Sequence, residues 1–421
     1  MHPWPNWIWR VPPKDEVTGS NPVGCAKINA HNRKNNMYLY DIIIIGAGAA
    51  GLSAAGAAVA QNKRVLILEM GDTVARKVTA SGGGRCNITN AAVAVDRYFG
   101  TNPNFVRSAI ARVPYTDILK WANAHQINLV EKTAGRYFCE NGAKLVTDAL
   151  IADTCGADIK TRQNVIEVQK NDDNFAVKTT DGLFYAKSVI VATGGTSFAT
   201  LGVSEIGYKI AKQFGHKIIP VRPALCAIKT TVIPTDLAGI AMPVKITIGK
   251  RTIYDDLLFT HFGIGGPAAY RTSLFDMPNG ITIDFAPNHN VAEVLKQAKH
   301  TSGRKNIVTI LSEYMPARVA RWLGGADTRN IADIKDSEIL SISNKIQNFH
   351  ICADNIKLHG LAAAEVVRGG VSVDEISSKT MESKLCRGLF FAGEVLDVAG
   401  DLGGFNLHWA WASGRTAGTY A

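Results

Sequence analysis

One short segment, an apolar run followed by a glycine-rich turn, constrains the fold of this chain more than any other. Asp41 is followed by four isoleucines, Ile42–Ile45, a β-branched run typical of a buried parallel strand. The next six residues, Gly46-Ala47-Gly48-Ala49-Ala50-Gly51, match G-x-G-x-x-G, and an alanine-rich stretch continues to about Gln61. A strand, this turn and a helix in that order are the context that a dinucleotide-binding turn requires. The segment therefore predicts the start of a doubly wound α/β domain.

Each glycine of the turn has a physical role in such a site. The first permits a tight turn, the second lets backbone approach a pyrophosphate, and the third lets the helix pack against the strand. The helix N-terminus then directs its dipole at the phosphates. Arg64–Glu69 is predicted as the second strand, and the Glu69 carboxylate at its end can accept hydrogen bonds from ribose hydroxyls, with Met70 beside it. The alternative is a purely structural turn between strand and helix.

Two later strand ends favour FAD over NAD as the dinucleotide. Ala192-Thr193-Gly194-Gly195 follows the apolar run Ser188–Val191, after a predicted antiparallel meander of three strands over Val165–Tyr185. Gly393-Glu394 follows a second predicted strand near the C-terminus. Both return backbone to one ligand-binding edge, as a long cofactor needs. A helix expected from Phe405-Asn406-Leu407, after Gly403-Gly404, can direct its first amides at a flavin carbonyl and stabilise negative charge on the reduced ring.

A third glycine cluster follows the second predicted strand. Its sequence is Ser81-Gly82-Gly83-Gly84-Arg85-Cys86-Asn87, with Lys77 shortly before it. Three consecutive glycines leave no side chain between the backbone and whatever lies against it. Arg85 and Asn87 can then reach polar atoms of a flavin or a substrate. The alternative, a flexible surface loop, does not explain the flanking polar residues.

The character of the sequence changes near Pro220. Val244–Ile248 and Ile281–Phe285 alternate with period two, which predicts a β-rich inserted domain. From Val291 to about Lys345 the apolar period becomes helical, which predicts a small helical module. The C-terminal segment returns to the strand–turn–helix pattern of the first domain.

Residues 1–36 differ in composition from the rest of the chain. They mix tryptophans with prolines, show no helical or strand period, and contain no apolar core of a secretory signal. The stretch Glu16–Pro22 can be encoded by a DNA string that resembles the T-arm of a transfer RNA gene. We expect residues 1–36 to be disordered or to lie upstream of a natural start at Met37. An intact mass of the protein from its native host decides between these.

The formal net charge of +10 favours a polyanionic partner, although excess charge also aids solubility. The basic residues are dense between positions 296 and 321, where the single acidic residue is Glu313. A solvated helix face usually carries acidic residues spaced to pair with the basic ones. The predicted RNA contact consists of Lys296, Lys299, Arg304, Lys305, Arg318 and Arg321. No RRM or KH signature is present, so this expectation rests on charge alone.

Several features argue against a membrane or metal-binding protein. The uncharged stretch Ile42–Ala60 has the length of a membrane span, but glycines interrupt it where a strand–turn–helix unit needs them. The seven cysteines are scattered, without C-x-x-C or zinc-ligand spacing, so neither a disulfide framework nor a metal site is predicted. We expect a cytoplasmic protein. The oligomeric state does not follow from the sequence.

The motifs together resemble a bacterial family of FAD-dependent oxidoreductases. Its members include aminoacetone oxidase-like enzymes, bile-acid dehydro-reductases and ribosomal RNA dihydrouridine synthases. The resemblance covers roughly Tyr38–Ala421 and rests on a series of motifs in order: Ser81–Asn87, Leu258–Gly263, Gly265–Ala268, Thr380–Lys384, Gly393–Asp397 and Gly403–Leu407. Two segments depart from the family pattern, Gly135–Cys139 and Leu201–Tyr208. Both can border the substrate pocket, so the substrate does not transfer with the resemblance.

The resemblance implies a three-part fold: a glutathione-reductase-like FAD-binding domain, interrupted by a β-barrel domain that itself carries a helical insert. The implied boundaries are 37–221 and 369–421 for the FAD-binding domain, 222–288 and 347–368 for the barrel, and 289–346 for the insert. Asp397 of the Gly393–Asp397 motif joins the expected cofactor contacts. The full predicted cofactor set is Gly46, Ala47, Gly48, Ala49, Ala50, Gly51, Glu69, Met70, Lys77, Ser81, Gly82, Gly83, Gly84, Arg85, Asn87, Ala192, Thr193, Gly194, Gly195, Gly393, Glu394, Asp397, Gly403, Gly404, Phe405, Asn406 and Leu407.

The catalytic acid is less well defined than the cofactor site. His261, set among glycines after Thr260, is one candidate, with a loop-ordering hydrogen bond as the alternative. Cys86 is a second candidate proton donor, with packing against the flavin as the alternative. No second G-x-G-x-x-G follows a strand, so NADH or NADPH is expected to dock transiently as electron donor.

Three functions remain open from the sequence. The first is reduction of a carbon–carbon double bond in structured RNA, such as uridine in ribosomal RNA giving dihydrouridine. The second is a small-molecule reductase or oxidase acting on an enone or an amine. The third is a non-catalytic, flavin-containing RNA-binding protein.

Overall fold

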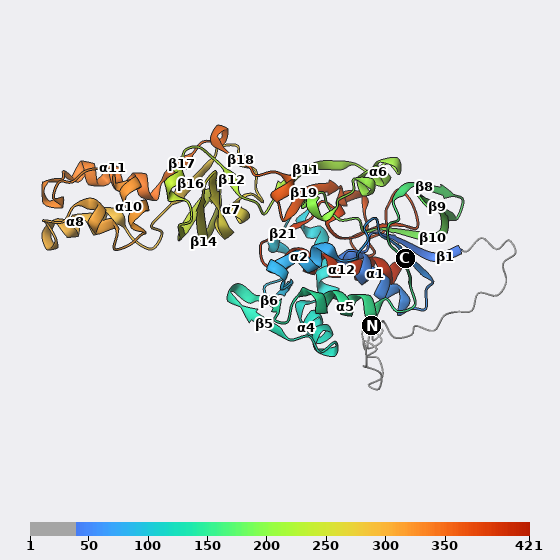
Figure 1. Cartoon of the computed structure of the whole chain (residues 1–421). Coiled ribbons are helices and arrows are strands. Elements are labelled where there is room, and N and C mark those ends of the chain that lie inside the picture. The colour runs from blue at the N-terminus through green and yellow to red at the C-terminus, as the bar shows by residue number, and fades with distance from the viewer. Residues whose placement is uncertain (1–38) are drawn as a thin grey trace. The chain divides into compact units, whose positions relative to one another are not determined.

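The computed structural model describes residues 39–421 (Figure 1). The expected extension 1–36 lies outside the described residues. The described chain forms two compact units. Unit 1 comprises the residues up to Val221 together with Arg368–Ala421, and unit 2 comprises Arg222–Val367.

Unit 1 is built on a seven-stranded sheet with the order β7-β2-β1-β10-β9-β8, in which β20 pairs with β10. Strand β1 is parallel to both β2 and β10, as the apolar isoleucine run predicted. Ile42–Ile45 are at most 3% exposed. The strands are β1 (Leu39–Ile45), β2 (Val65–Leu68), β7 (Asp158–Lys160), β8 (Val165–Asn171), β9 (Asn174–Thr179), β10 (Leu183–Val191) and β20 (Leu389–Phe391). The predicted α/β fold with a Rossmann-like dinucleotide-binding domain is confirmed.

Strand β10 corrects one detail of the sequence prediction. The sequence suggested a short meander strand ending at Tyr185 and a separate buried strand from Ser188. The structure has one continuous strand. One of its edges pairs antiparallel with β9 over Leu183–Ala186 and then parallel with β20 over Val189–Val191, and its other edge pairs parallel with β1 from Tyr185 onward. Its first residue, Leu183, is exposed, and its last three, Val189–Val191, are fully buried. The change in apolar pattern therefore marks a change of neighbours within one strand.

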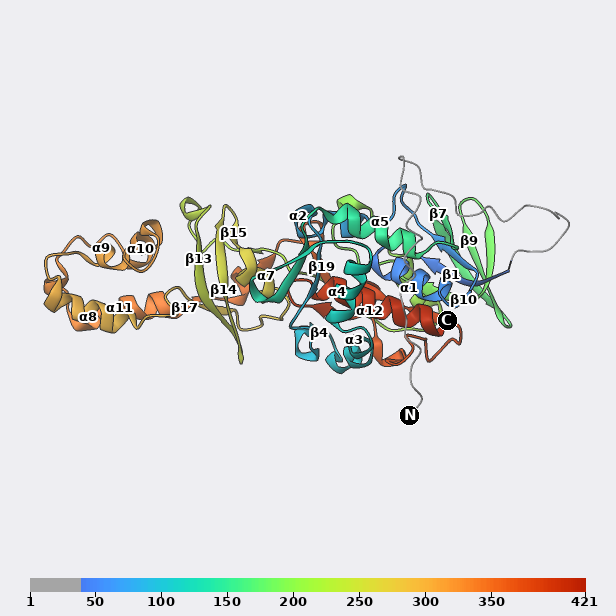
Figure 2. The same cartoon turned by 90° about the horizontal axis from the view of Figure 1, so that it is seen from below.

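The helices of unit 1 are α1 (Ala49–Val59), α2 (Arg76–Gly84), α3 (Arg107–Arg112), α4 (Tyr115–Ala124), α5 (Ala143–Asp153), α6 (Ile206–Gln213) and α12 (Phe405–Tyr420). The C-terminal helix α12 lies against α1 (Figures 1 and 2). A Cβ atom on Gly414 would lie 2.2 Å from the Ala50 carbonyl oxygen, and one on Gly418 would lie 2.0 Å from that of Ala54. Glycine at these two positions is therefore what permits so close a helix crossing. None of the helices in residues 39–421 is long and apolar enough to cross a membrane.

Two smaller sheets of unit 1 join segments that are distant in sequence. Strands β3 (Asn87–Asn90), β6 (Arg136–Cys139) and β5 (Leu129–Lys132) form a three-stranded antiparallel sheet. Strand β4 (Tyr98–Phe99) pairs with β21 (Ala399–Gly400). The second pairing holds the C-terminal glycine loop beside the N-terminal part of the chain. The strands β11 (Ile218–Ala224) and β19 (Val366–Val371) form a further two-stranded sheet.

Unit 2 contains an antiparallel sheet with the order β17-β16-β13-β14-β15-β12-β18. Its strands are β12 (Ile228–Lys229), β13 (Ala241–Ile248), β14 (Arg251–Thr260), β15 (Gly263–Gly265), β16 (Ile281–Asp284), β17 (Phe349–Ile351) and β18 (Lys357–Leu358). Alternate residues of β13 are buried, as the period-two pattern predicted. In the described residues no pairing joins β18 back to β17, so the closed barrel stays a prediction.

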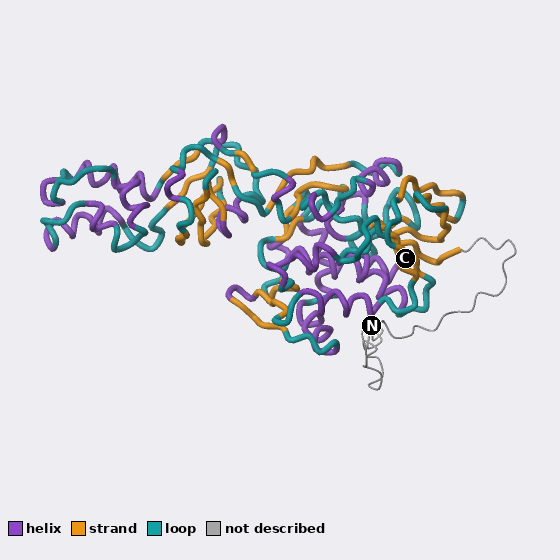
Figure 3. Tube along the Cα trace, viewed as in Figure 1, coloured by secondary structure: helices purple, strands orange, loops and turns teal. Residues whose placement is uncertain are grey.

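The helices of unit 2 are α7 (Gly266–Thr272), α8 (Val291–Thr301), α9 (Ile307–Leu311), α10 (Ala317–Gly324) and α11 (Asp336–Gln347). Helices α8–α11 fall between β16 and β17 in the chain, where the sequence predicted a helical module (Figure 3). Their buried residues, among them Leu295, Val319 and Ile346, share one apolar cluster with the sheet. Whether 289–346 is a separate module stays a prediction.

Candidate cofactor site

In the glycine turn between β1 and α1, two glycines are closely packed and the third borders open space. Gly46 has a φ of +104°, and a Cβ there would lie 2.5 Å from the Ala192 carbonyl oxygen. A Cβ on Gly51 would lie 1.9 Å from the Gly46 carbonyl oxygen. Gly48 is the N-cap of α1, and a Cβ there would meet no atom within 4 Å. The turn thus leaves room at Gly48 for a phosphate approaching the first amides of α1.

The Glu69 carboxylate lies beside this turn, immediately after β2. The backbone N–H of Ala47 donates to Glu69 Oε2 at 2.8 Å, and that of Gly71 donates to Oε1 at 2.7 Å. A carboxylate has about four acceptor positions, so both oxygens keep capacity for ribose hydroxyls. Arg76 Nη2 lies 3.5 Å from Glu69 Oε1. Met70 is half-buried next to it. Arg76 was not among the predicted site residues, because no local pattern relates α2 to the end of β2.

Glu394 joins the two later strand ends that the sequence assigned to one ligand. Gly195, after β10, donates its N–H to Glu394 Oε2 at 3.3 Å, and Glu394 itself follows β20. Lys77 Nζ, from α2, lies 3.0 Å from Oε2 and donates to Ser197 Oγ at 2.8 Å. Ser197 in turn donates to Glu394 Oε1 at 3.0 Å. The structure therefore brings Lys77, Gly195 and Glu394 together, and it adds Ser197, which the sequence analysis missed.

The cluster of three glycines is partly helical, and for it the sequence analysis predicted no secondary structure. Helix α2 extends through it, but Gly82 and Gly83 have φ values of +58° and +65° and interrupt the helical geometry together with Ser81. Gly82 faces the Phe138 ring, whereas a Cβ on Gly83 or Gly84 would meet no atom within 4 Å. The backbone is therefore open at the two later glycines, where a ligand can approach.

Cys86, one of the two candidate acids, lies in the core behind these glycines. Its side chain is fully buried, and its backbone N–H donates to the Ser81 carbonyl at 3.0 Å. Burial raises the pKa of the Cys86 thiol to about 12, so the thiol is protonated at neutral pH. Complete burial favours the packing alternative over the proton-donor role.

The C-terminal glycine loop ends at the first turn of α12. Gly404 is the N-cap, with a φ of +96°, and no side chain caps the helix. A Cβ on Gly404 would lie 2.5 Å from the Thr89 carbonyl oxygen. Phe405 is buried, Leu407 is half-buried, and Asn406 holds the loop by donating from Nδ2 to the Gly400 carbonyl at 2.9 Å. The uncapped first turn leaves amides available to a negatively charged flavin edge.

Two buried polar atoms next to this loop have no hydrogen-bond partner among the described residues. They are Asn87 Oδ1, on β3, and Arg136 Nε, on β6. A Cβ on Gly404 would lie 2.9 Å from Asn87 Oδ1, and one on Gly403 would lie 3.1 Å from Arg136 Nε. An unsatisfied buried polar atom is rare and needs an explanation, and here a ligand that supplies the missing partner is one that fits the adjoining glycine loop. The surroundings of the glycine loop thus fit the polar edge of a flavin.

Asp397 is buried, but its recorded bonds are structural. Its Oδ2 accepts the backbone N–H of Thr101 at 2.8 Å and the Thr101 hydroxyl at 2.7 Å. These bonds hold the segment after β4 against the segment after β20. Direct contact between Asp397 and the cofactor stays a prediction.

Residues of β3 form hydrogen bonds with α12 and with the glycine loop before it, and no sequence pattern predicted these contacts. Asn90 Nδ2 donates to the Gly403 carbonyl at 2.8 Å, and Trp411 Nε1 donates to the Ile88 carbonyl at 2.9 Å. Thr89 Oγ1 lies 2.8 Å from His408 Nδ1. Burial lowers the pKa of His408 to about 4, and the backbone of Val113 only partly offsets this, so the ring is neutral at pH 7.

His261, the other candidate acid, belongs to unit 2. It lies on the turn between β14 and β15 and is exposed. Its role as an acid stays a prediction. Within the part of the chain that the structure describes, no cluster of three or more His, Cys, Asp or Glu side chains is arranged to hold a metal ion.

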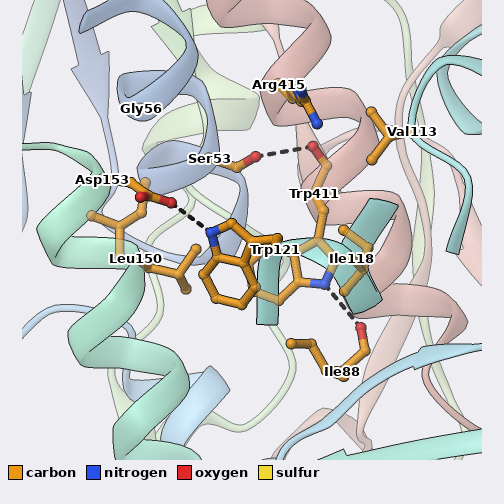
Figure 4. Close-up of a pocket in the computed structure, with 11 residues that line it drawn as sticks. Ser53, Gly56, Ile88, Val113, Ile118, Trp121, Leu150, Asp153, Trp411 and Arg415 are labelled. Carbon is orange, nitrogen blue, oxygen red and sulfur yellow. Dashed lines mark hydrogen bonds between the residues drawn. The ribbon is translucent and has the colours of Figure 1, made fainter. Parts of the chain in front are cut away.

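A pocket lies among α1, α4, α5 and α12, and none of the predicted cofactor residues lines it (Figure 4). Ser53 donates to the Trp411 carbonyl at 3.0 Å across it, and Trp121 Nε1 donates to Asp153 Oδ2 at 2.6 Å. Most of the lining is apolar, including Leu52, Ile118 and Leu150. The pocket is therefore separate from the glycine loops.

Comparison with known proteins identifies the protein family of the chain that carries these loops. The family model described as the HI0933-like protein Rossmann domain matches residues 40–420. The chain belongs to this family. The HI0933-like proteins are FAD-dependent oxidoreductases, so the predicted cofactor and the resemblance drawn from the motifs are confirmed, and the protein is an enzyme of this class.

Three curated relatives match this HI0933-like protein over nearly the whole of their own length. The Haemophilus influenzae protein named "Ribosomal RNA dihydrouridine synthase" is 40% identical over 385 residues, covering 88% of this chain and 96% of the relative. The Escherichia coli protein of the same name is 34% identical, covering 90% and 96%. The "3-dehydro-bile acid delta(4,6)-reductase" of Clostridium scindens is 29% identical, covering 90% and 98%.

Proposed function

We propose that this HI0933-like protein reduces the 5,6 double bond of a uridine in ribosomal RNA and so forms dihydrouridine. One observation carries the proposal: two relatives with this printed function are 40% and 34% identical and match over 96% of their length. The non-catalytic alternative is set aside because the family consists of oxidoreductases.

The chain's own residues support FAD at several points. Gly48 and the first amides of α1 would hold the pyrophosphate, Glu69 would accept from the ribose, and Glu394, fixed by Lys77 and Ser197, would face the later part of the cofactor. When bound and reduced, FAD supplies a hydride to one carbon of a polarised double bond. The first turn of α12 would stabilise negative charge at the flavin carbonyl.

Reduction of uridine also needs a proton at the second carbon of the double bond. A general acid close to the substrate must supply it. Cys86 is protonated but buried, whereas His261 is exposed, so His261 is the preferred candidate. Replacing His261 with Gln should then lower turnover by about 10²–10⁴-fold and leave FAD content unchanged.

NADH or NADPH is proposed as an electron donor that docks transiently against the flavin. The sequence contains no second glycine motif after a strand that would hold a nicotinamide permanently. A nicotinamide cofactor that stays with the enzyme through gel filtration would contradict this.

The helical part of unit 2 is proposed as an electrostatic contact for RNA, with fewer residues than the sequence predicted. The sequence suggested that most acidic partners were missing, but Lys299 pairs with Asp336 at 2.8 Å and Lys305 pairs with Glu313 at 2.8 Å. Arg318 donates to the Asp236 carbonyl. The remaining cations of the predicted contact are Lys296, Arg304 and Arg321. The earlier expectation missed Asp336, because it lies outside the basic stretch and only the fold brings it near.

A nucleoside analysis tests the proposed function directly. Ribosomal RNA from a strain lacking the gene should contain less dihydrouridine than wild type, and the gene should restore it. A variant with Lys296, Arg304 and Arg321 changed to Glu should restore less while retaining FAD, since phosphate contacts are electrostatic and a target base must leave its stack to be reached. Unchanged dihydrouridine in the deletion strain overturns the proposal.

A second candidate substrate is a small enone. The relative from Clostridium scindens is named for the reduction of a bile acid, and it matches 90% of this chain. Turnover of an enone by the purified enzyme with NADPH, in the absence of any change in RNA, would favour this alternative.

A further inference from the structure

The sheet formed by β3, β6 and β5 presents cationic side chains on one face. In an antiparallel pair, residues directly opposite each other point to the same face. Lys132 is opposite Arg136, Val130 is opposite Phe138, and Phe138 is opposite Asn87. Residues two apart on a strand share a face, so Lys132, Arg136, Phe138 and Asn87 lie on one side of this sheet.

The Phe138 ring holds two cations above it. Lys132 Nζ lies 5.0 Å from the ring centroid, and the guanidinium carbon of Arg85 lies 5.9 Å from it. Both distances are in the range of a cation–π interaction. We call Arg85, Lys132, Arg136 and Phe138 the β6 face.

The cations of the β6 face lack carboxylate partners. Within residues 39–421 none of Arg85, Lys132 and Arg136 forms an ion pair. The acidic residues nearest in sequence are turned elsewhere: Glu131 accepts from Tyr137 Oη at 2.7 Å on the opposite side of the sheet, and Glu140 accepts from Asn128 Nδ2 at 2.5 Å. Such a concentration of one charge favours a polyanion.

The β6 face also adjoins the loops that would hold the flavin. A Cβ on Gly403 would lie 3.1–3.3 Å from the Nε, Cγ and Cδ atoms of Arg136. A Cβ on Gly82 would lie 3.1 Å from Cε1 of Phe138. An RNA strand on this face would therefore pass next to the cofactor, which a substrate must do.

We propose that the β6 face binds phosphates of a single-stranded RNA segment that flanks the target base. Arg85, Lys132 and Arg136 supply the charge, and Phe138 positions the first two. Exposed glycine backbone at Gly83 and Gly84 leaves space for the strand beside them. The inference rests on the proposed function and adds a contact surface in unit 1 to the one proposed in unit 2.

Charge reversal at Lys132 in the full-length, FAD-loaded protein tests this. Fluorescence anisotropy with a labelled oligouridine gives the Kd across a series of KCl concentrations. Lys132→Glu should weaken binding by roughly tenfold, and the slope of log K against log salt should fall by about 0.7 for one lost phosphate contact on a single strand. Lys132→Arg should bind like wild type, since it keeps the charge.

Lys63→Glu is the matched control. Lys63 is exposed in the turn before β2, at the ends of the parallel strands opposite the glycine turn, and it has the same charge change. It should bind within about twofold of wild type, because one remote charge alters only the screened long-range field.

Three other outcomes would contradict the inference. If Lys132→Glu binds as tightly as Lys63→Glu, the β6 face does not contact RNA, and the proposed function stands. If Lys132→Glu purifies without FAD, the residue serves the cofactor and not RNA. If wild type binds no oligouridine and the deletion strain keeps its dihydrouridine, the proposed function and the inference fall together.

Discussion

Gly51 lies so close to Gly46 that a Cβ atom on Gly51 would be 1.9 Å from the Gly46 carbonyl oxygen. Two residues of one motif thus fix the path of the chain from β1 into α1. Gly48, between them, has open space where its side chain would be. The motif therefore contains two glycines that the fold requires and one, Gly48, that is predicted to be required only by the bound cofactor.

Substitutions at these two positions should have different effects. Gly51→Ala should destabilise unit 1 by about 1–3 kcal/mol through overpacking, seen as a lower Tm even without FAD. Gly48→Val should fold with a Tm close to that of the wild-type apoprotein and purify colourless, because the side chain fills the space for the pyrophosphate. A yellow Gly48→Val protein would place the phosphates elsewhere.

Glu69→Gln should weaken FAD binding. The carboxylate accepts from Ala47 and Gly71 and keeps capacity for the ribose, and a hydrogen bond to a charged group contributes about 1.5–3 kcal/mol. We expect the Kd for FAD, measured by titration of the apoprotein, to rise by roughly tenfold or more. Asp41→Asn is the control: Asp41 accepts from Arg64 and Lys187 at the other end of β1, so its Kd should match wild type.

The stability of unit 1 should fall in mild acid because of His408. Burial holds its folded-state pKa at about 4, below the ordinary value of 6.5, so the unfolded chain binds this proton more readily. The stabilising contribution is complete above pH 6.5 and is lost as the pH falls from 6.5 towards 4, at most about 3 kcal/mol. His408→Leu should be less stable at pH 7 but should show a smaller decrease in Tm between pH 7 and 4.5. An equal decrease in both proteins would contradict this.

Cys86 should be dispensable for catalysis. Its thiol is buried and has a pKa of about 12, so thiol reagents should label the exposed Cys352 in the native protein and reach Cys86 only after unfolding. Cys86→Ala should keep turnover within about twofold. A loss of about 10²–10⁴-fold with normal FAD content would instead support a proton-donor role.

The sequence by itself determined the fold class and the start of the cofactor site. Both could be predicted from Ile42–Ile45 and Gly46–Gly51, because a buried strand and a G-x-G-x-x-G turn depend on neighbouring residues within one short segment. The position of Glu69 directly after β2 and the start of α12 at Phe405, after two glycines, follow from the same local rules of strand pattern and helix boundaries.

Tertiary structure decided every contact that joins distant segments. Ser197 and Lys77 bind Glu394, and Arg136 packs against Gly403. Asp336 pairs with Lys299, which is 37 residues away in the sequence, and Lys77 and Glu394 are 317 residues apart. Local periodicity contains no information about such pairs, because they depend on where strands and helices lie in three dimensions. The charge of a segment can be read from its residues, but which of those charges are neutralised is decided only when the chain folds.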